Sequence, residues 1–120
     1  MKKTKNAFLF ALEGLQYAFA HERNFKIEIF CAVAVCIAGF VLGISTSEWL
    51  IVIINIGFVL SAELVNTAIE NLCNVTTKEI NPAIKIIKDV AAAAVLLAAV
   101  AAFICALIIF VPAFFKIINS

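Results

Sequence analysis

The fold class is decided by residues 90–115, which read VAAAAVLLAAVAAFICALIIFVPAFF. Cys105 is the one ionisable side chain in this run, and about 20 apolar residues are enough to carry a helix across the hydrocarbon core of a bilayer. Pro112 lies near the far end of the run, where a missing backbone N–H is easier to accommodate than at the middle of a helix. We therefore expect a transmembrane helix over residues 83–115.

The composition of the whole chain agrees with a membrane protein. Hydrophobic residues make up 65% of the 120 residues, against about 45–50% in soluble globular proteins. Charged residues make up 14%. A disordered chain, or one that coats nucleic acid, needs a polar and strongly charged composition, so both classes are excluded and no nucleic-acid partner is expected. The length predicts a single domain over residues 1–120.

Two further spans are expected, over residues 25–43 and 48–73. Each has an apolar run that is too short by itself and reaches membrane length when charged residues at one end are included. Glu28 is such a residue at the start of the first span, and Glu63 and Glu70 lie in the final turns of the second. Between these spans, Ser47 is expected to cap the second one.

The N-terminal segment, residues 6–20, follows a basic start and resembles a signal peptide at first sight. Glu13 and Gln16 interrupt its apolar core, and no small-residue cleavage site stands out. We expect an amphipathic helix in the membrane interface. Before the last span, Asn81 is a suitable N-cap and Pro82 suits the first helical position.

The charged residues are distributed unevenly between the two sides of the three expected spans. Eight of the nine Lys and Arg residues, and six of the eight Asp and Glu residues, fall on one side of the three expected spans. By the positive-inside rule this side is cytoplasmic. The N-terminus and the loop before the last span are then predicted inside the cell, and the C-terminus outside.

The second span carries a stripe of polar residues, which we call the polar seam. At about 100° per residue, Glu63, Asn66, Glu70 and Asn74 lie on one narrow stripe of the helix. A carboxylate at membrane depth costs about 2.5 kcal/mol or more on insertion scales, so two of them indicate a functional site. A structural alternative is that the glutamates pair with cations to fix helix packing. Carboxylates that face lysines are also suited to bind Mg²⁺ and the phosphates of a nucleotide.

The stretch Glu63-Leu-Val-Asn-Thr-Ala-Ile-Glu70, followed by Lys88-Asp-Val-Ala-Ala-Ala-Ala-Val95, resembles the signature of the prokaryotic diacylglycerol kinase family, which includes the undecaprenol kinases. Glu22-Arg-Asn-Phe25 resembles the entry to that family's first span. The likeness covers nearly the whole chain. It implies a homotrimeric helical bundle in the bacterial cytoplasmic membrane, whose active sites transfer the γ-phosphoryl group of ATP to a lipid alcohol.

The resemblance also implies roles for individual residues. By position, Glu63 matches the general base, while Glu22 and Glu70 match the carboxylates that bind Mg²⁺ on the ATP phosphates. Lys88 and Asp89 match a nucleotide-contacting pair. Glu79 and Asn81 fall where the family's loop approaches adenine, and Lys3 falls where a basic N-terminal residue approaches phosphate. Three more polar residues are expected to support the site or the substrate, and these are Glu28, Asn66 and Asn74.

The chain departs from the family pattern at Asn74, where an aspartate is usual, and at Ala93, where a glycine is usual. Neither change removes the expected base or metal ligands. Residues 22–25 and 108–112 look more like the undecaprenol kinase branch than the diacylglycerol kinase branch. Two hypotheses from other classes of protein stay open. One is a small transporter or channel subunit, in which Glu63 and Glu70 bind protons or cations, and the other is a structural membrane subunit.

Overall fold

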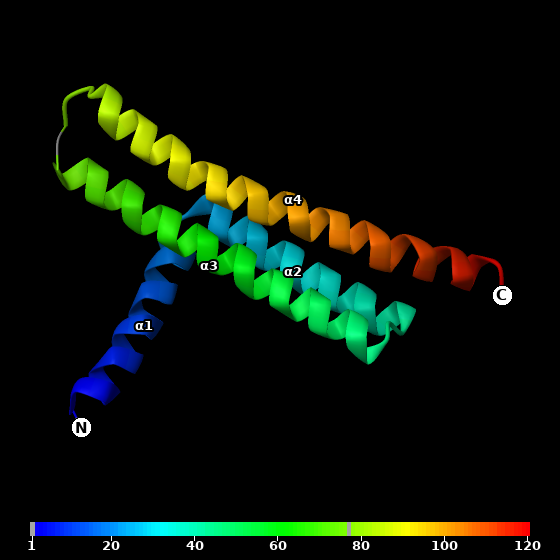
Figure 1. Cartoon of the computed structure of the whole chain (residues 1–120). Coiled ribbons are helices and arrows are strands. Elements are labelled where there is room, and N and C mark those ends of the chain that lie inside the picture. Colours follow the sequence, from blue (N-terminus) through cyan, green and yellow to red (C-terminus); the bar gives the residue numbers. More distant parts are fainter. Residues whose placement is uncertain (1, 77) are drawn as a thin grey trace.

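The structure is a computed structural model that describes residues 2–76 and 78–120, with side chains from residue 6 onward. It consists of four helices, α1 (Lys2–His21), α2 (Arg23–Leu42), α3 (Thr46–Thr76) and α4 (Pro82–Ile118) (Figure 1). No strand occurs in these described ranges. The expectation of an all-α fold is confirmed.

Three of the helices are long and apolar enough to cross a membrane, by their length and composition. α2 has 20 residues, α3 has 31 and α4 has 37. At a rise of 1.5 Å per residue, α3 and α4 are about 46 and 55 Å long, which exceeds the roughly 30 Å hydrocarbon core of a bilayer. Their ends therefore extend beyond that core, as the charged residues near their shared loop require.

The three long helices lie side by side, whereas α1 leaves them at a wide angle (Figure 1). A small core of Ile44, Val52 and Ile109 holds them together, with partly buried apolar side chains around it. Many other large apolar side chains are exposed, among them Phe40, Phe58 and Phe103. Such faces are compatible with lipid tails, or with further helices. One chain thus encloses little volume, and the location of α1 in the membrane interface stays a prediction.

The α2–α3 turn is built by a glycine and a capping box. Gly43 has a φ of 65°, in the left-handed region, and its N–H donates to the carbonyl oxygen of Gly39. The N–H of Glu48 donates to the hydroxyl of Ser45, and the N–H of Ser45 donates to the Glu48 carboxylate. This reciprocal pair is a capping box. The cap of α3 is therefore Ser45, and the expectation of Ser47, which lies inside the helix, was wrong.

The start of α4 follows the expectation. The side chain of Asn81 accepts a hydrogen bond of 2.9 Å from the N–H of Ala83, and Pro82 takes the first helical position. Proline suits this position because its missing N–H would have no partner within the helix. Pro112 lies inside α4, close to its C-terminal end.

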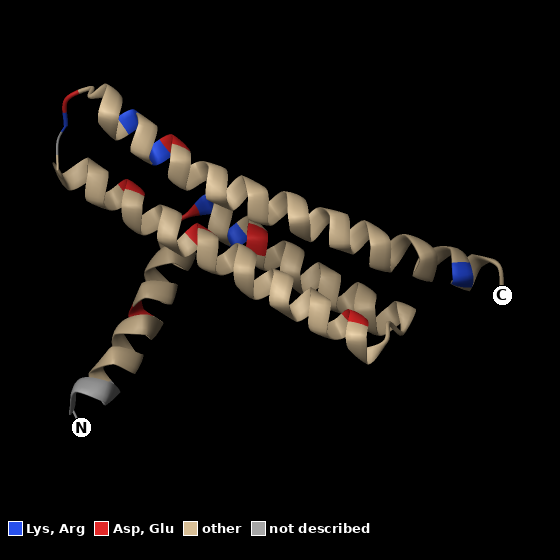
Figure 2. Cartoon of the chain, in the orientation of Figure 1, with Lys and Arg blue, Asp and Glu red and all other residues tan. Residues whose placement is uncertain are grey.

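Charged residues gather at one end of the molecule (Figure 2). They surround the junction of α1 with α2 and the loop between α3 and α4, whereas Glu48 and Lys116 lie at the opposite end of the long helices. A route for ions across a bilayer would need polar groups along its length. In the structure most charged residues are instead concentrated towards one end of the long helices.

Candidate functional site

The centre of the candidate site is Glu63, on the part of α3 that passes the start of α2. Its side chain is 2% exposed, which is exceptional for a carboxyl group. The carboxyl contacts that of Glu28 on α2 and the side-chain amide of Asn66, one turn along α3. Two ionised carboxylates in contact repel each other, so this pair requires a proton or a cation to stabilise it.

Two further carboxylates lie close by. Glu22, at the junction of α1 and α2, and Glu70, on α3, are near enough to act electrostatically on Glu63. The structure therefore brings together five residues named from the sequence, which are Glu22, Glu28, Glu63, Asn66 and Glu70.

The structural alternative for this seam required cations as partners of the glutamates. Among the residues whose side chains are described, neither Glu63 nor Glu70 forms an ion pair. The carboxylates are therefore gathered without the basic partners that a purely packing role would call for.

Three buried oxygen atoms near this group have no hydrogen-bond partner within the described part of the chain. They are Oε1 of Glu28, Oδ1 of Asn66 and Oγ1 of Thr67. An unsatisfied buried polar group costs about 1–3 kcal/mol, and oxygen atoms of this kind are available to accept a hydrogen bond from a ligand or to bind a cation. Thr67 was missed in the sequence, although it follows Glu63 by four residues and therefore lies on the same helix face.

The donor set fits Mg²⁺ in kind. No group of three or more His, Cys, Asp or Glu side chains in the described residues is placed to hold a metal ion by itself. Mg²⁺ commonly uses one or two carboxylates and completes its shell with water and substrate phosphates. Glu22 and Glu70, both in electrostatic range of Glu63, are suited to such a shared ion.

A second polar group connects α3 with α4. Nζ of Lys88 donates a hydrogen bond of 2.7 Å to Oδ1 of Asn74. Asp89 pairs with Lys85, one turn earlier on α4, with 2.6 Å between Nζ and Oδ2. The neighbours Lys88 and Asp89 thus have different partners, and Lys85 was not among the site residues named from the sequence.

The remaining candidates lie towards the α3–α4 loop. Thirteen residues of helix separate Glu63 from the end of α3, which is about 20 Å along its axis. Glu79 and Asn81 lie beyond that end, and the Asn81 side chain is engaged in capping α4. The Lys3 side chain falls outside the described residues. The candidate residues therefore form an extended row and not a compact cluster.

The chain is similar to known proteins over most of its length. The family profile described as prokaryotic diacylglycerol kinase matches residues 9–110, from α1 to near the end of α4. The chain is similar to the undecaprenol kinase of Bacillus subtilis, with 41% identity over 106 residues that cover 88% of this chain and 86% of that protein. It is also similar to the diacylglycerol kinase of a Synechocystis species, with 40% identity over 99 residues that cover 82% of this chain and 57% of that protein.

Proposed function

The chain belongs to the prokaryotic diacylglycerol kinase family and is a membrane lipid kinase, and from this premise we propose that it transfers the γ-phosphoryl group of ATP to the hydroxyl of undecaprenol. The product is then undecaprenyl phosphate, and with diacylglycerol as the acceptor it is phosphatidic acid. The observation that carries the proposal is the buried carboxyl of Glu63, in contact with Glu28 and Asn66. No other described carboxyl on α3 or α4 is buried.

Glu63 is the general base of this reaction. As the lipid oxygen attacks the γ-phosphorus, its proton passes to the Glu63 carboxylate, and the bond to the bridging oxygen of ATP breaks to release ADP. General-base assistance contributes about 10²–10⁴-fold to a rate. Glu63 lies in a helix long and apolar enough to span a membrane, towards its charged end, so the lipid hydroxyl would meet it near the surface of the bilayer.

The other candidate residues, which lie between Glu63 and the α3–α4 loop, position the nucleotide. Phosphoryl transfer depends mainly on alignment and on neutralisation of phosphate charge. Glu22 and Glu70 would hold Mg²⁺, which supplies positive charge to the phosphates when bound. Glu70 and Asn74 follow Glu63 by about 10 and 16 Å along the α3 axis. With its γ-phosphate at Glu63, ATP then extends towards Lys88 and the α3–α4 loop, where Glu79 and Asn81 lie.

Two features support undecaprenol as the acceptor and a trimer as the active form. Residues 22–25 and 108–112 resemble the undecaprenol kinase branch, and the Bacillus relative of that name matches over most of both chains. A groove of about 870 Å³ between α3 and α4 is lined mostly by large apolar residues such as Phe58, and also by Asn66 and by small residues that include Gly57 and Ala94. Small residues allow close approach of a helix in a membrane, so a second copy can pack beside the site.

The test is a phosphorylation assay in mixed micelles with ATP, Mg²⁺ and either undecaprenol or diacylglycerol. We expect phospholipid product from the wild-type protein, and a turnover about 10²–10⁴-fold lower for Glu63→Gln. Glu13→Gln, on the exposed face of α1, is the matched control and should keep wild-type turnover.

Two outcomes would contradict the proposal. Product from neither lipid, with folded wild-type protein, would refute the kinase reaction itself and favour the transporter reading. Wild-type turnover of Glu63→Gln at saturating lipid would leave the reaction intact and exclude Glu63 as the base.

A further inference from the structure

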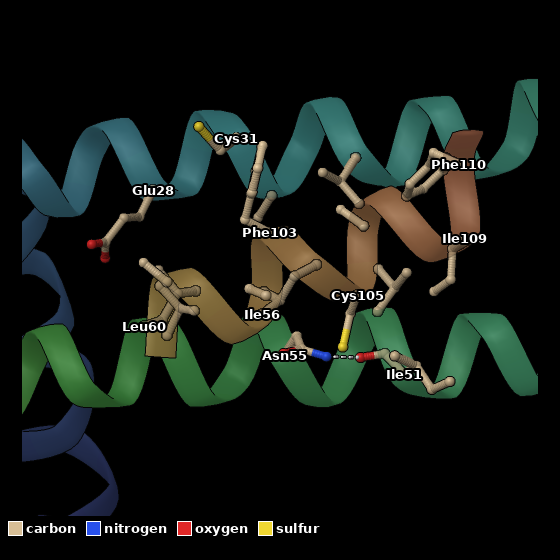
Figure 3. Close-up of a pocket in the computed structure, with 17 residues that line it drawn as sticks. Glu28, Cys31, Ile51, Asn55, Ile56, Leu60, Phe103, Cys105, Ile109 and Phe110 are labelled. Carbon is tan, nitrogen blue, oxygen red and sulfur yellow. Dashed lines mark hydrogen bonds between the residues drawn. The ribbon is translucent and has the colours of Figure 1, made fainter. Parts of the chain in front are cut away.

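The end of the bundle that lies opposite the candidate site carries a separate pocket. An apolar groove between α2, α3 and α4 begins at Glu28 and ends at Ile109 and Phe110 (Figure 3). Beyond that end lies a pocket of about 400 Å³, formed by the α2–α3 turn, the start of α3 and the C-terminal part of α4. This pocket shares Ile109 with the groove and has no residue in common with the candidate site. The proposed kinase reaction assigns no role to it.

The pocket is lined by one acidic and one basic side chain, which come from different helices. These are Glu48 on α3 and Lys116 on α4. Neither forms an ion pair among the side chains that the structure describes. Oε1 of Glu48 accepts the capping hydrogen bond from Ser45, whereas Oε2 of Glu48 and Nζ of Lys116 have no hydrogen-bond partner within the described residues. The pocket therefore offers both a carboxylate oxygen and an ammonium group to a ligand.

The position of the pocket along α4 corresponds to a layer of lipid headgroups. Lys88 and Lys116 are 28 residues apart in this helix, which is about 42 Å along its axis. A bilayer with both of its headgroup layers is about 40–45 Å thick. With Lys88 at one surface of the membrane, Lys116 therefore lies among the headgroups of the other leaflet. Apolar side chains such as Leu42 and Pro112 also line the pocket, so it has a part suited to hydrocarbon.

We infer that this pocket binds a phospholipid with a primary ammonium headgroup, such as phosphatidylethanolamine, from the leaflet opposite the candidate site. The ammonium group of the lipid donates hydrogen bonds to Glu48, and its phosphodiester pairs with Lys116. The start of an acyl chain lies against Leu42 and Pro112. This lipid is a ligand and not the acceptor of the phosphoryl group, so the inference does not depend on the proposed function.

The two charged side chains have different consequences for lipid binding. Lys116 attracts the phosphate that all phospholipids share, so it sets the affinity for any of them. Glu48 attracts a cation that can donate hydrogen bonds, so it sets the preference among headgroups. Phosphatidylglycerol has no cation in its headgroup and therefore leaves Glu48 without a partner of opposite charge.

The test titrates the full chain in neutral detergent micelles with short-chain phosphatidylethanolamine or phosphatidylglycerol and follows the emission of Trp49, the residue next to Glu48. The wild type should bind phosphatidylethanolamine about three- to tenfold more tightly than phosphatidylglycerol. Lys116→Met keeps the apolar stem and should weaken binding of both lipids by about the same factor. Glu48→Gln keeps an acceptor for the capping box and should abolish the preference between the lipids. Lys78→Met, in the exposed α3–α4 loop, is the matched control and should bind both lipids like the wild type.

The inference is overturned if the wild type does not distinguish the two lipids, or if Lys116→Met binds them as Lys78→Met does. Soluble phosphoethanolamine has the same charged groups without acyl chains and should bind about tenfold more weakly or worse. Equal binding of phosphoethanolamine would assign the pocket to a free zwitterion and overturn the assignment to a lipid. If the variants do not fold, a phosphatidylethanolamine with a photoreactive group at the start of one acyl chain is used with the wild type. Adducts within residues 109–117 are expected, and their absence from this stretch would exclude the site.

Discussion

Replacement of Gly39 by alanine should weaken the packing of α2 on α3 at the end of the bundle far from Glu63. Gly39 is buried, and a Cβ at this position would lie 2.8 and 2.9 Å from two ring atoms of Trp49 and 3.1 Å from Ile44. Favourable contacts between carbon atoms begin at about 3.5 Å. The Trp49 ring must therefore move to accommodate one methyl group.

The size of the effect follows from how firmly the ring is held. Trp49 also packs against Phe40, with 5.0 Å between the ring centroids, so it has little freedom to turn away. Overpacking of this kind costs about 1–3 kcal/mol. Alanine has a higher helix propensity than glycine by about 1 kcal/mol, which offsets part of this cost. We expect the free energy of unfolding to fall by up to about 2 kcal/mol relative to the wild type, and to lie about 1–3 kcal/mol below that of a glycine-to-alanine change without overpacking.

Trp49 is the single tryptophan of the chain, so its fluorescence reports directly on the contact. Unfolding in mixed micelles, titrated with a denaturing detergent and followed by this fluorescence, gives the free energy. Gly14→Ala on α1 is the matched control, because a Cβ there meets no atom within 4 Å. Its stability should be equal to or above that of the wild type. If Gly39→Ala is as stable as Gly14→Ala, with unchanged Trp49 emission, the close contact does not constrain the bundle.

Two further predictions concern the α3–α4 loop and use the same titration. Asn81→Ala removes the acceptor of the Ala83 N–H and should lower the free energy of unfolding by about 1 kcal/mol, and an unchanged value would exclude a stabilising cap. Asn74→Asp turns the hydrogen bond from Lys88 into an exposed ion pair, so stability should change by less than about 1 kcal/mol and become sensitive to salt. A larger change, or one that persists at high salt, would contradict this reasoning.

The helices were predictable because length and hydropathy constrain a membrane span strongly. The cap of α3 was not predicted correctly, although its signal is present in the sequence. A capping box needs a Glu or Gln three residues after the cap, and Glu48 stands in this relation to Ser45, whereas Ser47 is followed at that distance by Leu50. The link between the first two spans offers several serine and threonine residues, and the position of the glutamate three residues later decides which of them caps the helix.

The candidate site was predictable within one helix and not between helices. The period of an α-helix places Glu63, Asn66 and Glu70 on one face, and this grouping is observed. No periodicity specifies which residue of α2 faces that seam, and the contact between Glu28 and Glu63 required the structure. The resemblance names Lys88 and Asp89 as nucleotide-contacting residues and does not include Lys85. Residues four apart are neighbours on a helix, and Asp89 forms an ion pair with Lys85 at this spacing.

The distribution of the cations distinguishes a ligand site from a packing device. A seam that served only to hold helices together would pair its carboxylates with nearby basic side chains, since buried charges without partners are strongly unfavourable. Here the lysines of α4 are engaged elsewhere, Lys85 by Asp89 and Lys88 by Asn74. Glu63 and Glu70 have no ion pair within the described residues. The gathered carboxylates repel one another when they are ionised, and in the proposed function a cation that arrives with the phosphates of a nucleotide would relieve that repulsion.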